Sequence, residues 1–181
     1  MLNILLKKEE AEKFVRKSYE LLKDNIEQCA KYRAENGKYL YKAGERVIAL
    51  KEIEEGISLF PKENKHKYTK FLLECLEILF INEEFEALNK YIDEALDLAI
   101  TVDNDVLIEK AYYFKGMTYQ KSGMFFQAEM YMNLSTDKLL RNATNQQRYK
   151  RYNEMGELYY NLGETREAIK YFTLAVNLEK R

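Results

Sequence analysis

The chain has 181 residues, of which 46% are hydrophobic and 33% charged, and its formal net charge is −1. It contains seven glycines and one proline, where average usage at this length gives about 13 and about 9. Both residues interrupt helices and populate turns, so their scarcity predicts long helices and excludes turn-rich β-sandwiches and barrels. The balanced charge disfavours a protein that binds nucleic acid directly through a basic face.

The first predicted element is a helix within residues 1–29. This stretch has a short apolar start followed by charges, which is not the pattern of a secretory signal peptide. Nowhere does the sequence hold a run of about 18 apolar residues, so no membrane-spanning helix is expected. Cys29 and Cys75 lack the spacing of metal ligands, and we expect two buried thiols in a reducing, cytoplasmic compartment.

Residues 30–181 contain an internal repeat that is marked by glycines. Three glycine pairs lie seven residues apart, and an alanine stands five residues after each pair. A large hydrophobic residue follows four positions later, and a small residue three positions beyond that. The positions are Gly37, Gly44, Ala49, Ile53 and Gly56; Gly116, Gly123, Ala128, Met132 and Ser135; and Gly156, Gly163, Ala168, Phe172 and Ala175. This spacing predicts antiparallel helix pairs that cross closely at small residues, with a left-handed glycine ending each first helix.

The pattern resembles the tetratricopeptide repeat, a helix–turn–helix motif. The resemblance implies an all-α, right-handed superhelical solenoid of about four repeats, preceded by an extra N-terminal helix. The expected domains are an N-terminal helix at 1–29, acting as a cap or half repeat, and a solenoid at 30–181. Its repeats are expected at about 30–63, 68–101, 109–142 and 149–181.

Two parts of the chain fit the repeat less completely. In the second repeat, Cys75, Asn82 and Ala87 take the places of the two glycines and the alanine, but Glu94 stands where a small residue is expected and Ala95 follows it. The register of this repeat is therefore open by one residue. At the start of the chain, the spacing of the second helix recurs at Ala11, Val15 and Ser18.

The resemblance also implies that the first helices line a groove for an extended peptide or protein segment. The family's groove positions fall on Lys38, Tyr41 and Lys42; on Tyr113, Met117 and Gln120; and on Asn153, Glu157, Tyr160 and Asn161. Amide side chains can hold the main chain of a peptide, and tyrosines add contact area at low entropic cost. In the second repeat these positions fall on Leu72, Leu76, Leu79 and Phe80, which fit a groove floor or an ordinary helix core.

The roughly 40-residue period and the composition rich in tyrosine, lysine and asparagine are similar to the sensor domains of bacterial peptide-pheromone receptors, the RRNPP group. That resemblance implies the regulatory sensor part of a bacterial signalling or transcription regulator. The alternative is a structural scaffold that assembles through its outer surfaces. Apolar residues of the last predicted helix, including Ile169, Phe172 and Val176, would then support assembly, for example as a homodimer.

Catalytic motifs are not evident in the sequence. His66 is the single histidine and lies in a lysine-rich segment. The sequence has no phosphate-binding glycine loop, no metalloprotease motif and no nucleophile elbow. We therefore expect a protein that is not an enzyme and that uses no cofactor or metal.

The densest basic stretch runs from Lys138 to Arg151, with five basic residues and no acidic one. It is expected to be a solvated loop and helix start, or else a surface for an acidic partner. Within it, Thr144 and Gln147 are spaced as a capping box, which predicts that the last repeat's first helix begins here.

Overall fold

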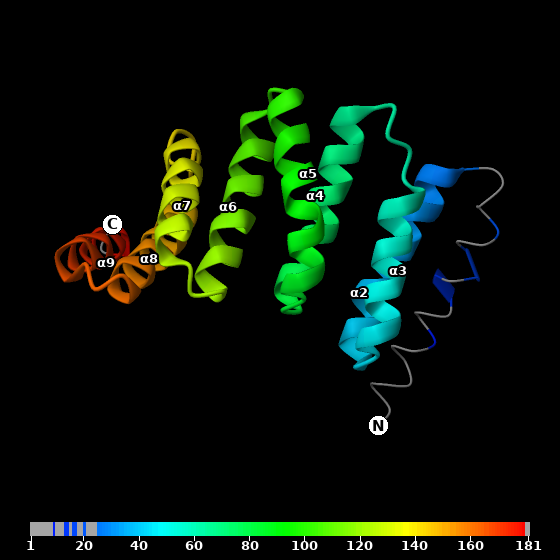
Figure 1. Cartoon of the computed structure of the whole chain (residues 1–181), viewed down its shortest axis with the longest axis horizontal. Coiled ribbons are helices and arrows are strands. Elements are labelled where there is room, and N and C mark those ends of the chain that lie inside the picture. The colour runs from blue at the N-terminus through cyan, green and yellow to red at the C-terminus, as the bar shows by residue number, and fades with distance from the viewer. Residues whose placement is uncertain (1–8, 10–12, 15, 18–19, 21–24, 180–181) are drawn as a thin grey trace. The chain divides into compact units, whose positions relative to one another are not determined.

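The computed structural model describes residues 9, 13, 14, 16, 17, 20 and 25–179, and every element in this part of the chain is an α-helix (Figure 1). The predicted all-α repeat is therefore confirmed. The bounds are α2 Ile26–Ala43, α3 Arg46–Leu59, α4 Lys65–Ile81, α5 Phe85–Thr101, α6 Asp105–Lys121, α7 Phe125–Leu139, α8 Asn145–Asn161 and α9 Thr165–Glu179.

The chain forms two compact units, the N-terminal unit at residues 1–91 and the C-terminal unit at residues 92–181, with the division inside α5. The helix α2 begins at Ile26, where Asn25 caps it by accepting a hydrogen bond from the amide of Gln28 at 2.9 Å. The residues on which the predicted N-terminal half repeat depends lie outside the described part of the chain; these are Ala11, Val15 and Ser18.

Three hairpins turn at a left-handed glycine, as the sequence predicts. Gly44, Gly123 and Gly163 have φ angles of 85°, 74° and 79°. In the first hairpin the amide of Gly44 donates to the carbonyl of Tyr41 and the next amide donates to that of Leu40, both at 3.0 Å. This pattern satisfies the last carbonyls of a helix within a short connection.

The fourth turn, between α4 and α5, has Glu83 rather than Asn82 in the left-handed position. Glu83 has φ of 59° and its amide donates to the carbonyl of Phe80 at 3.1 Å, which matches the glycine turns. The alignment of Asn82 with Gly44 is therefore wrong by one residue. The left-handed residues of these four hairpin turns are spaced 39, 40 and 40 residues apart, which is a more regular repeat than the sequence alignment suggested. Asp103, between two hairpins, also has a positive φ, of 49°.

Small residues sit where paired helices cross, as predicted. A Cβ atom on Gly37 would lie 2.5 Å from Cγ1 of Ile53 and 2.8 Å from the carbonyl oxygen of Ala49. A Cβ atom on Gly156 would lie 2.6 Å from the ring of Phe172. Both approaches are shorter than any ordinary carbon contact, so only glycine fits without a shift of the neighbouring helix or of the side chain it carries.

Each unit has its own hydrophobic core. In the N-terminal unit Ile53 and Leu72 are fully buried, and Phe60 stacks on Phe71 with ring centroids 4.3 Å apart. In the C-terminal unit the core cluster includes Ala128, Met132, Met155, Leu158, Tyr159 and Ala168. The two thiols predicted to be buried and free are both so. No helix in the described part is long and apolar enough to cross a membrane.

Candidate functional site

The candidate site is a groove between α2 and α4, the first helices of two successive hairpins in the N-terminal unit. Two adjoining cavities of about 510 Å³ and 370 Å³ form it, and they share Lys31, Phe71 and Glu74. We call it the α2–α4 groove. Its lining residues are Glu27, Lys31, Ala34, Glu35 and Lys38 of α2, Phe60, and Lys67, Lys70, Phe71, Glu74, Cys75, Glu77, Ile78 and Ile81 of α4.

The lining residues recur at helical spacing, which places them along one face of each helix. On α4 the buried Phe71 forms part of the floor, Ile78 is half-buried, and Ile81 is 70% exposed at the far end. The groove thus has an apolar strip along α4 that becomes more open toward the end of the helix.

An ion pair joins α2 and α4 at the other end. The Glu27 carboxylate lies 2.6 Å from the Lys31 ammonium and 3.2 Å from that of Lys67. Hydrogen bonds from these two lysines hold the pKa of Glu27 below its usual range. The two helices are therefore linked where both begin, and they run in the same direction from there (Figure 1).

Farther along the groove, the charges are less fully neutralised. Lys70 and Glu74 are exposed and form no ion pair within the described part of the chain. Lys38 lies 3.4 Å from Glu35 on its own helix, in an exposed pair of a kind that contributes little to stability. These side chains can exchange their present contacts for those of a ligand at small cost.

The structure brings one of the three groove residues predicted in the first repeat into this site. Lys38 lines the α2–α4 groove. Tyr41 is buried beside Glu84, and its burial raises the pKa of its hydroxyl. Lys42 lies outside the groove, with its ammonium 5.3 Å from the ring centre of Tyr39.

The second repeat shows the effect of the register. Leu72, Leu76 and Leu79 are fully buried, so they belong to the core and not to a groove floor. With the register moved by one residue, two of the groove positions fall on Glu77 and Ile81, which do line the α2–α4 groove. The sequence alone did not reveal this register. The left-handed turn residue is Glu83, and a glutamate does not indicate a left-handed position in a sequence.

A smaller groove lies between α6 and α8 in the C-terminal unit, with a volume of about 160 Å³. Tyr113, one of the predicted residues, lines it and donates a hydrogen bond from its hydroxyl to Oε1 of Glu154 at 2.9 Å. Burial and the neighbouring carboxylate raise the pKa of this hydroxyl. The lining residues are Glu109, Tyr113, Leu139, Gln147, Lys150, Arg151 and Glu154.

Arg151 forms the back of this smaller groove and is 5% exposed. Its guanidinium lies 2.8 Å from Glu109 and 3.2 Å from Glu154, and it donates to the hydroxyl of Ser135 at 2.7 Å. The predicted solvated basic stretch is therefore wrong for Arg151, because its charge is neutralised inside the unit. The predicted capping box of α8 is confirmed.

The remaining predicted groove residues lie outside the α6–α8 cavity. Met117 packs against the core cluster of the C-terminal unit. Gln120 is half-buried, and its side-chain oxygen has no hydrogen-bond partner among the described residues. On α8, Asn153 is half-buried, whereas Glu157, Tyr160 and Asn161 are exposed.

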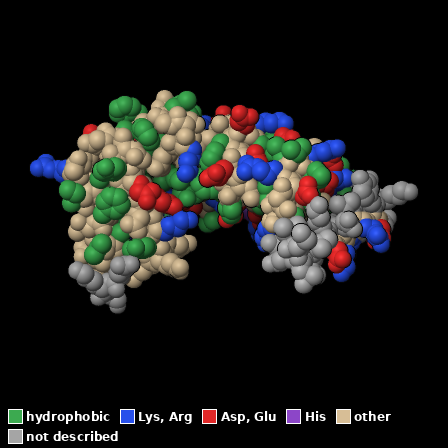
Figure 2. Space-filling model, turned by 90° about the horizontal axis from the view of Figure 1, so that it is seen from below, with side chains coloured by type: hydrophobic (Ala, Val, Ile, Leu, Met, Phe, Trp, Pro, Cys, Tyr) green, Lys and Arg blue, Asp and Glu red, His purple; other side chains and the backbone are tan. Residues whose placement is uncertain are grey.

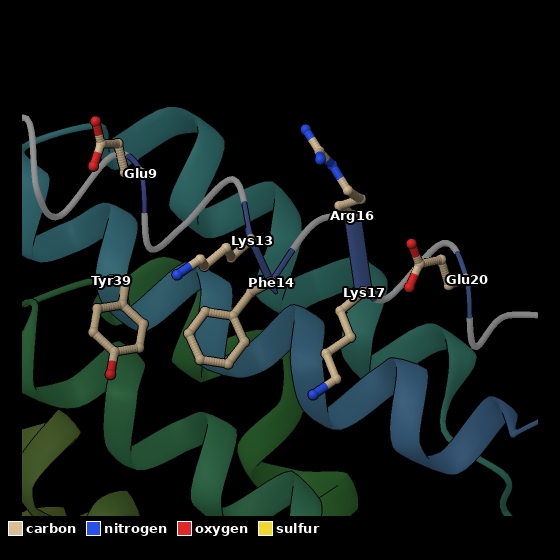
Figure 3. Close-up of a pocket in the computed structure, with 7 residues that line it drawn as sticks. All are labelled: Glu9, Lys13, Phe14, Arg16, Lys17, Glu20 and Tyr39. Atoms are coloured by element: carbon tan, nitrogen blue, oxygen red, sulfur yellow. The ribbon is translucent and has the colours of Figure 1, made fainter.

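A further cavity of about 760 Å³ lies beside Tyr39 (Figure 3). Phe14 stacks on Tyr39 there, with ring centroids 5.1 Å apart, and Arg16 points away from both rings in Figure 3. Tyr39 is the only lining residue from α2. The α2–α4 groove, in contrast, is lined by several residues from each of two helices. Within the described residues, no group of His, Cys, Asp or Glu side chains could hold a metal ion.

No protein-family model matches the chain, and no curated protein sequence matches it. Solved structures do match. BtubC (BKLC) from P. vanneervenii is 15% identical, with a TM-score of 0.75 over 98% of this chain and 72% of that chain. The MamA RS-1 ArsTM double mutant is 14% identical, with a TM-score of 0.61 over 94% of each chain. At these identities the similarity shows the fold alone, an all-helical repeat that fits the resemblance to tetratricopeptide repeats.

Proposed function

We propose that this chain is a non-enzymatic binding module that holds an extended peptide or protein segment in the α2–α4 groove. The observation that carries the proposal is the groove itself, which combines a strip of apolar side chains with two exposed charged groups, Lys70 and Glu74, that form no ion pair within the described part of the chain. Ligand sites are typically concave and apolar, with a few polar groups that fix orientation. Two parallel helices offer such a surface over several residues of an extended chain.

A narrower proposal is that the module is the sensor part of a bacterial regulator in the cytoplasm, and that its ligand is a short signalling peptide. It would then contact neither nucleic acid nor membrane directly. The repeat period supports this, because the left-handed turn residues are 39 to 40 residues apart, in keeping with the roughly 40-residue period on which that resemblance rests.

The experiment is selection of peptides from a random dodecamer display library against the full chain. Enriched peptides are then compared on a groove variant, Lys38→Glu with Ile81→Glu. Both side chains are exposed, so the fold should survive. We expect the variant to weaken binding by about tenfold or more, since it reverses a charge and removes part of the apolar wall.

The matched control is Lys42→Glu with Val47→Glu, which makes the same chemical changes outside the groove. Val47 is 84% exposed on α3. We expect this control to bind the selected peptides like the native chain. The proposal would be contradicted if none of the enriched peptides bound the groove variant more weakly. It would also be contradicted if both variants lost the same amount of binding affinity.

An alternative function, as a structural scaffold, is favoured by apolar stripes on the C-terminal unit. On α7, Phe126, Met130 and Leu134 recur every four residues and are 79%, 51% and 41% exposed. On α9, Ile169 and Val176 are 61% and 47% exposed. Figure 2 shows hydrophobic side chains on the face of this part of the molecule, at the left of the view.

Scaffolding of this kind would include a homodimer formed through the C-terminal repeat. Analytical ultracentrifugation of the native chain and of Phe126→Ser with Ile169→Ser separates the two functions. A dimer that both substitutions disrupt would support the scaffold. A monomer at high protein concentration would argue against self-assembly.

A further inference from the structure

The helix α4 carries its charges in an order that does not favour the helix itself. Lys65, Lys67 and Lys70 lie in its first two turns, whereas Glu74 and Glu77 lie in its second half, and the first turn has no acidic residue. A helix has a partial positive charge at its N-terminus and a partial negative charge at its C-terminus. Each of these charged side chains is therefore on the less favourable half of α4.

Pairing between neighbours does not compensate for this order. Lys70 and Glu74 are four residues apart, with the lysine first, which is the weaker orientation for a helical ion pair. They form no ion pair with each other or with another described residue. Both side chains line the α2–α4 groove. The charge order of α4 is thus explained better by what the groove binds than by the stability of the helix.

The lysines of α4 therefore lie near its start, and near its end the groove has apolar side chains on α4 beside the carboxylates of Glu74 and Glu77. Lys67 and Lys70 line the first part, and Ile78 and Ile81 line the last part. Between Lys70 and Ile78 the helix rises about 12 Å. An extended peptide covers that distance in about four residues, and side chains an even number of residues apart point to the same side.

Building on the function proposed above, we infer that the α2–α4 groove selects an extended segment with a carboxylate side chain beside Lys70 and an aliphatic side chain, four residues away, against Ile78 and Ile81. Glu74 lies between the two subsites and can accept hydrogen bonds from amide groups of the peptide main chain.

The test uses blocked, fluorescein-labelled octapeptides in a serine background, titrated with the full chain and followed by fluorescence anisotropy. The first probe has two aspartates and, four residues further on, two leucines. A second probe has the reverse order, because an extended chain can lie in the groove in either direction. Companion peptides replace both aspartates by lysine or both leucines by serine. We expect one aspartate–leucine order to bind at least about fivefold more tightly than either companion.

Variants of α4 locate the recognition. Lys70→Glu should abolish the preference for aspartate over lysine, while Lys65→Glu, an equal charge change at an exposed residue outside the groove, should leave it intact. The preference should also shrink when NaCl is raised from about 0.05 M to about 0.5 M, because ions screen exposed charges.

The inference is overturned if neither aspartate–leucine probe binds, if the lysine companion binds equally well, or if Lys70→Glu and Lys65→Glu have the same effect. The function proposed above can hold even where this inference fails. Library peptides that depend on Lys38 and Ile81 but carry no acidic residue would preserve the groove as a peptide site and refute only its selection of a carboxylate.

Discussion

Each unit contains one buried arginine that is neutralised by two carboxylates, but the two arginines connect different parts of the fold. Arg33 is 7% exposed and pairs with Glu52 at 3.0 Å and with Glu55. Both partners lie on α3, so these two ion pairs join the helices of the α2–α3 hairpin. Arg151 instead reaches Glu109 of α6 and Ser135 of α7 from its own position on α8.

The two arginine clusters have similar chemistry, but one stabilises contacts within a hairpin and the other stabilises contacts between hairpins. The Arg33 cluster fixes two helices of one hairpin, whereas the Arg151 cluster links one hairpin to the next. Its guanidinium also lies 4.8 Å from the ring centre of Tyr113, which adds a cation–π contact between α8 and α6. A loss at Arg151 should therefore loosen the packing among α6, α7 and α8, whereas a loss at Arg33 removes two ion pairs between α2 and α3.

The largest expected effect comes from Arg151→Met. The substitution leaves the carboxylate of Glu109, 16% exposed, without its cation and leaves Glu154 with only the exposed Lys150, 3.8 Å away. We expect a loss of about 3 kcal/mol in the free energy of unfolding. Arg33→Met should cost less, about 1 to 2 kcal/mol, because only Glu52, 13% exposed, stays buried without its cation, whereas Glu55 is 37% exposed and can turn toward water. Urea unfolding followed by circular dichroism measures both, and equal losses would refute the distinction.

The two close helix crossings should also respond unequally to an added methyl group. In Gly37→Ala the new carbon meets the backbone oxygen of Ala49 and the fully buried Ile53, so we expect a loss of about 2 kcal/mol. In Gly156→Ala it meets the ring of Phe172, which is 36% exposed and can rotate. There the loss should be about 1 kcal/mol or less. Differential scanning calorimetry compares the two, and a larger loss at Gly156 would contradict this account.

A smaller effect should appear in alkaline solution, through Tyr159 of the C-terminal core. Burial raises the pKa of this hydroxyl to about 12, above the ordinary value of about 10. Between these two pH values the unfolded chain releases the proton while the folded chain keeps it, so stability falls as pH rises. Tyr159→Phe should remove up to about 1 kcal/mol of the decrease seen between about pH 9 and pH 11.

Urea unfolding at the two pH values measures this change in slope. Tyr160→Phe is the matched control, because Tyr160 is the next residue on α8 and is 71% exposed. A pH dependence that Tyr159→Phe leaves unaltered would show that the hydroxyl of Tyr159 is not protected in the folded chain.

The smallest effect concerns the helix α4 of the N-terminal unit. Lys70→Glu places an acidic residue in the second turn, where the helix dipole weakly favours it, but four residues before Glu74, which repels it. The two effects oppose each other, so we expect the free energy of unfolding to change by about 0.5 kcal/mol or less. A variant of nearly unchanged stability that loses the binding of acidic peptides would separate ligand recognition from stability. A large decrease in the melting temperature would mean that Lys70 supports the fold.

Much of the fold was predictable because small residues and left-handed glycines have strict geometric requirements. Gly37 and Gly44 illustrate this, since their spacing alone indicates a close crossing followed by a helix end. The register of α4 was not predictable in the same way. Its turn is formed by Glu83, a residue type that seldom adopts positive φ, and the one-residue error moved the expected groove positions onto buried leucines.

The candidate site was predictable only in part. Lys38 and Tyr113 do line grooves between first helices. The burial of Tyr41 and the pairing of Arg151 with two carboxylates could not be predicted from the sequence, because both outcomes depend on which helix packs alongside. Lys70 and Ile81 were missed for the same reason, since a groove wall is defined by the neighbouring helix as much as by its own.

Binding of an extended peptide in the α2–α4 groove can be tested directly with a ¹H–¹⁵N correlation spectrum of the assigned chain. On addition of a peptide enriched by selection, we expect shifts that cluster at Lys31, Lys38, Ile78 and Ile81. Shifts confined to the exposed stripe at Phe126, Met130 and Leu134 of α7 would contradict it and place the binding surface on the C-terminal unit.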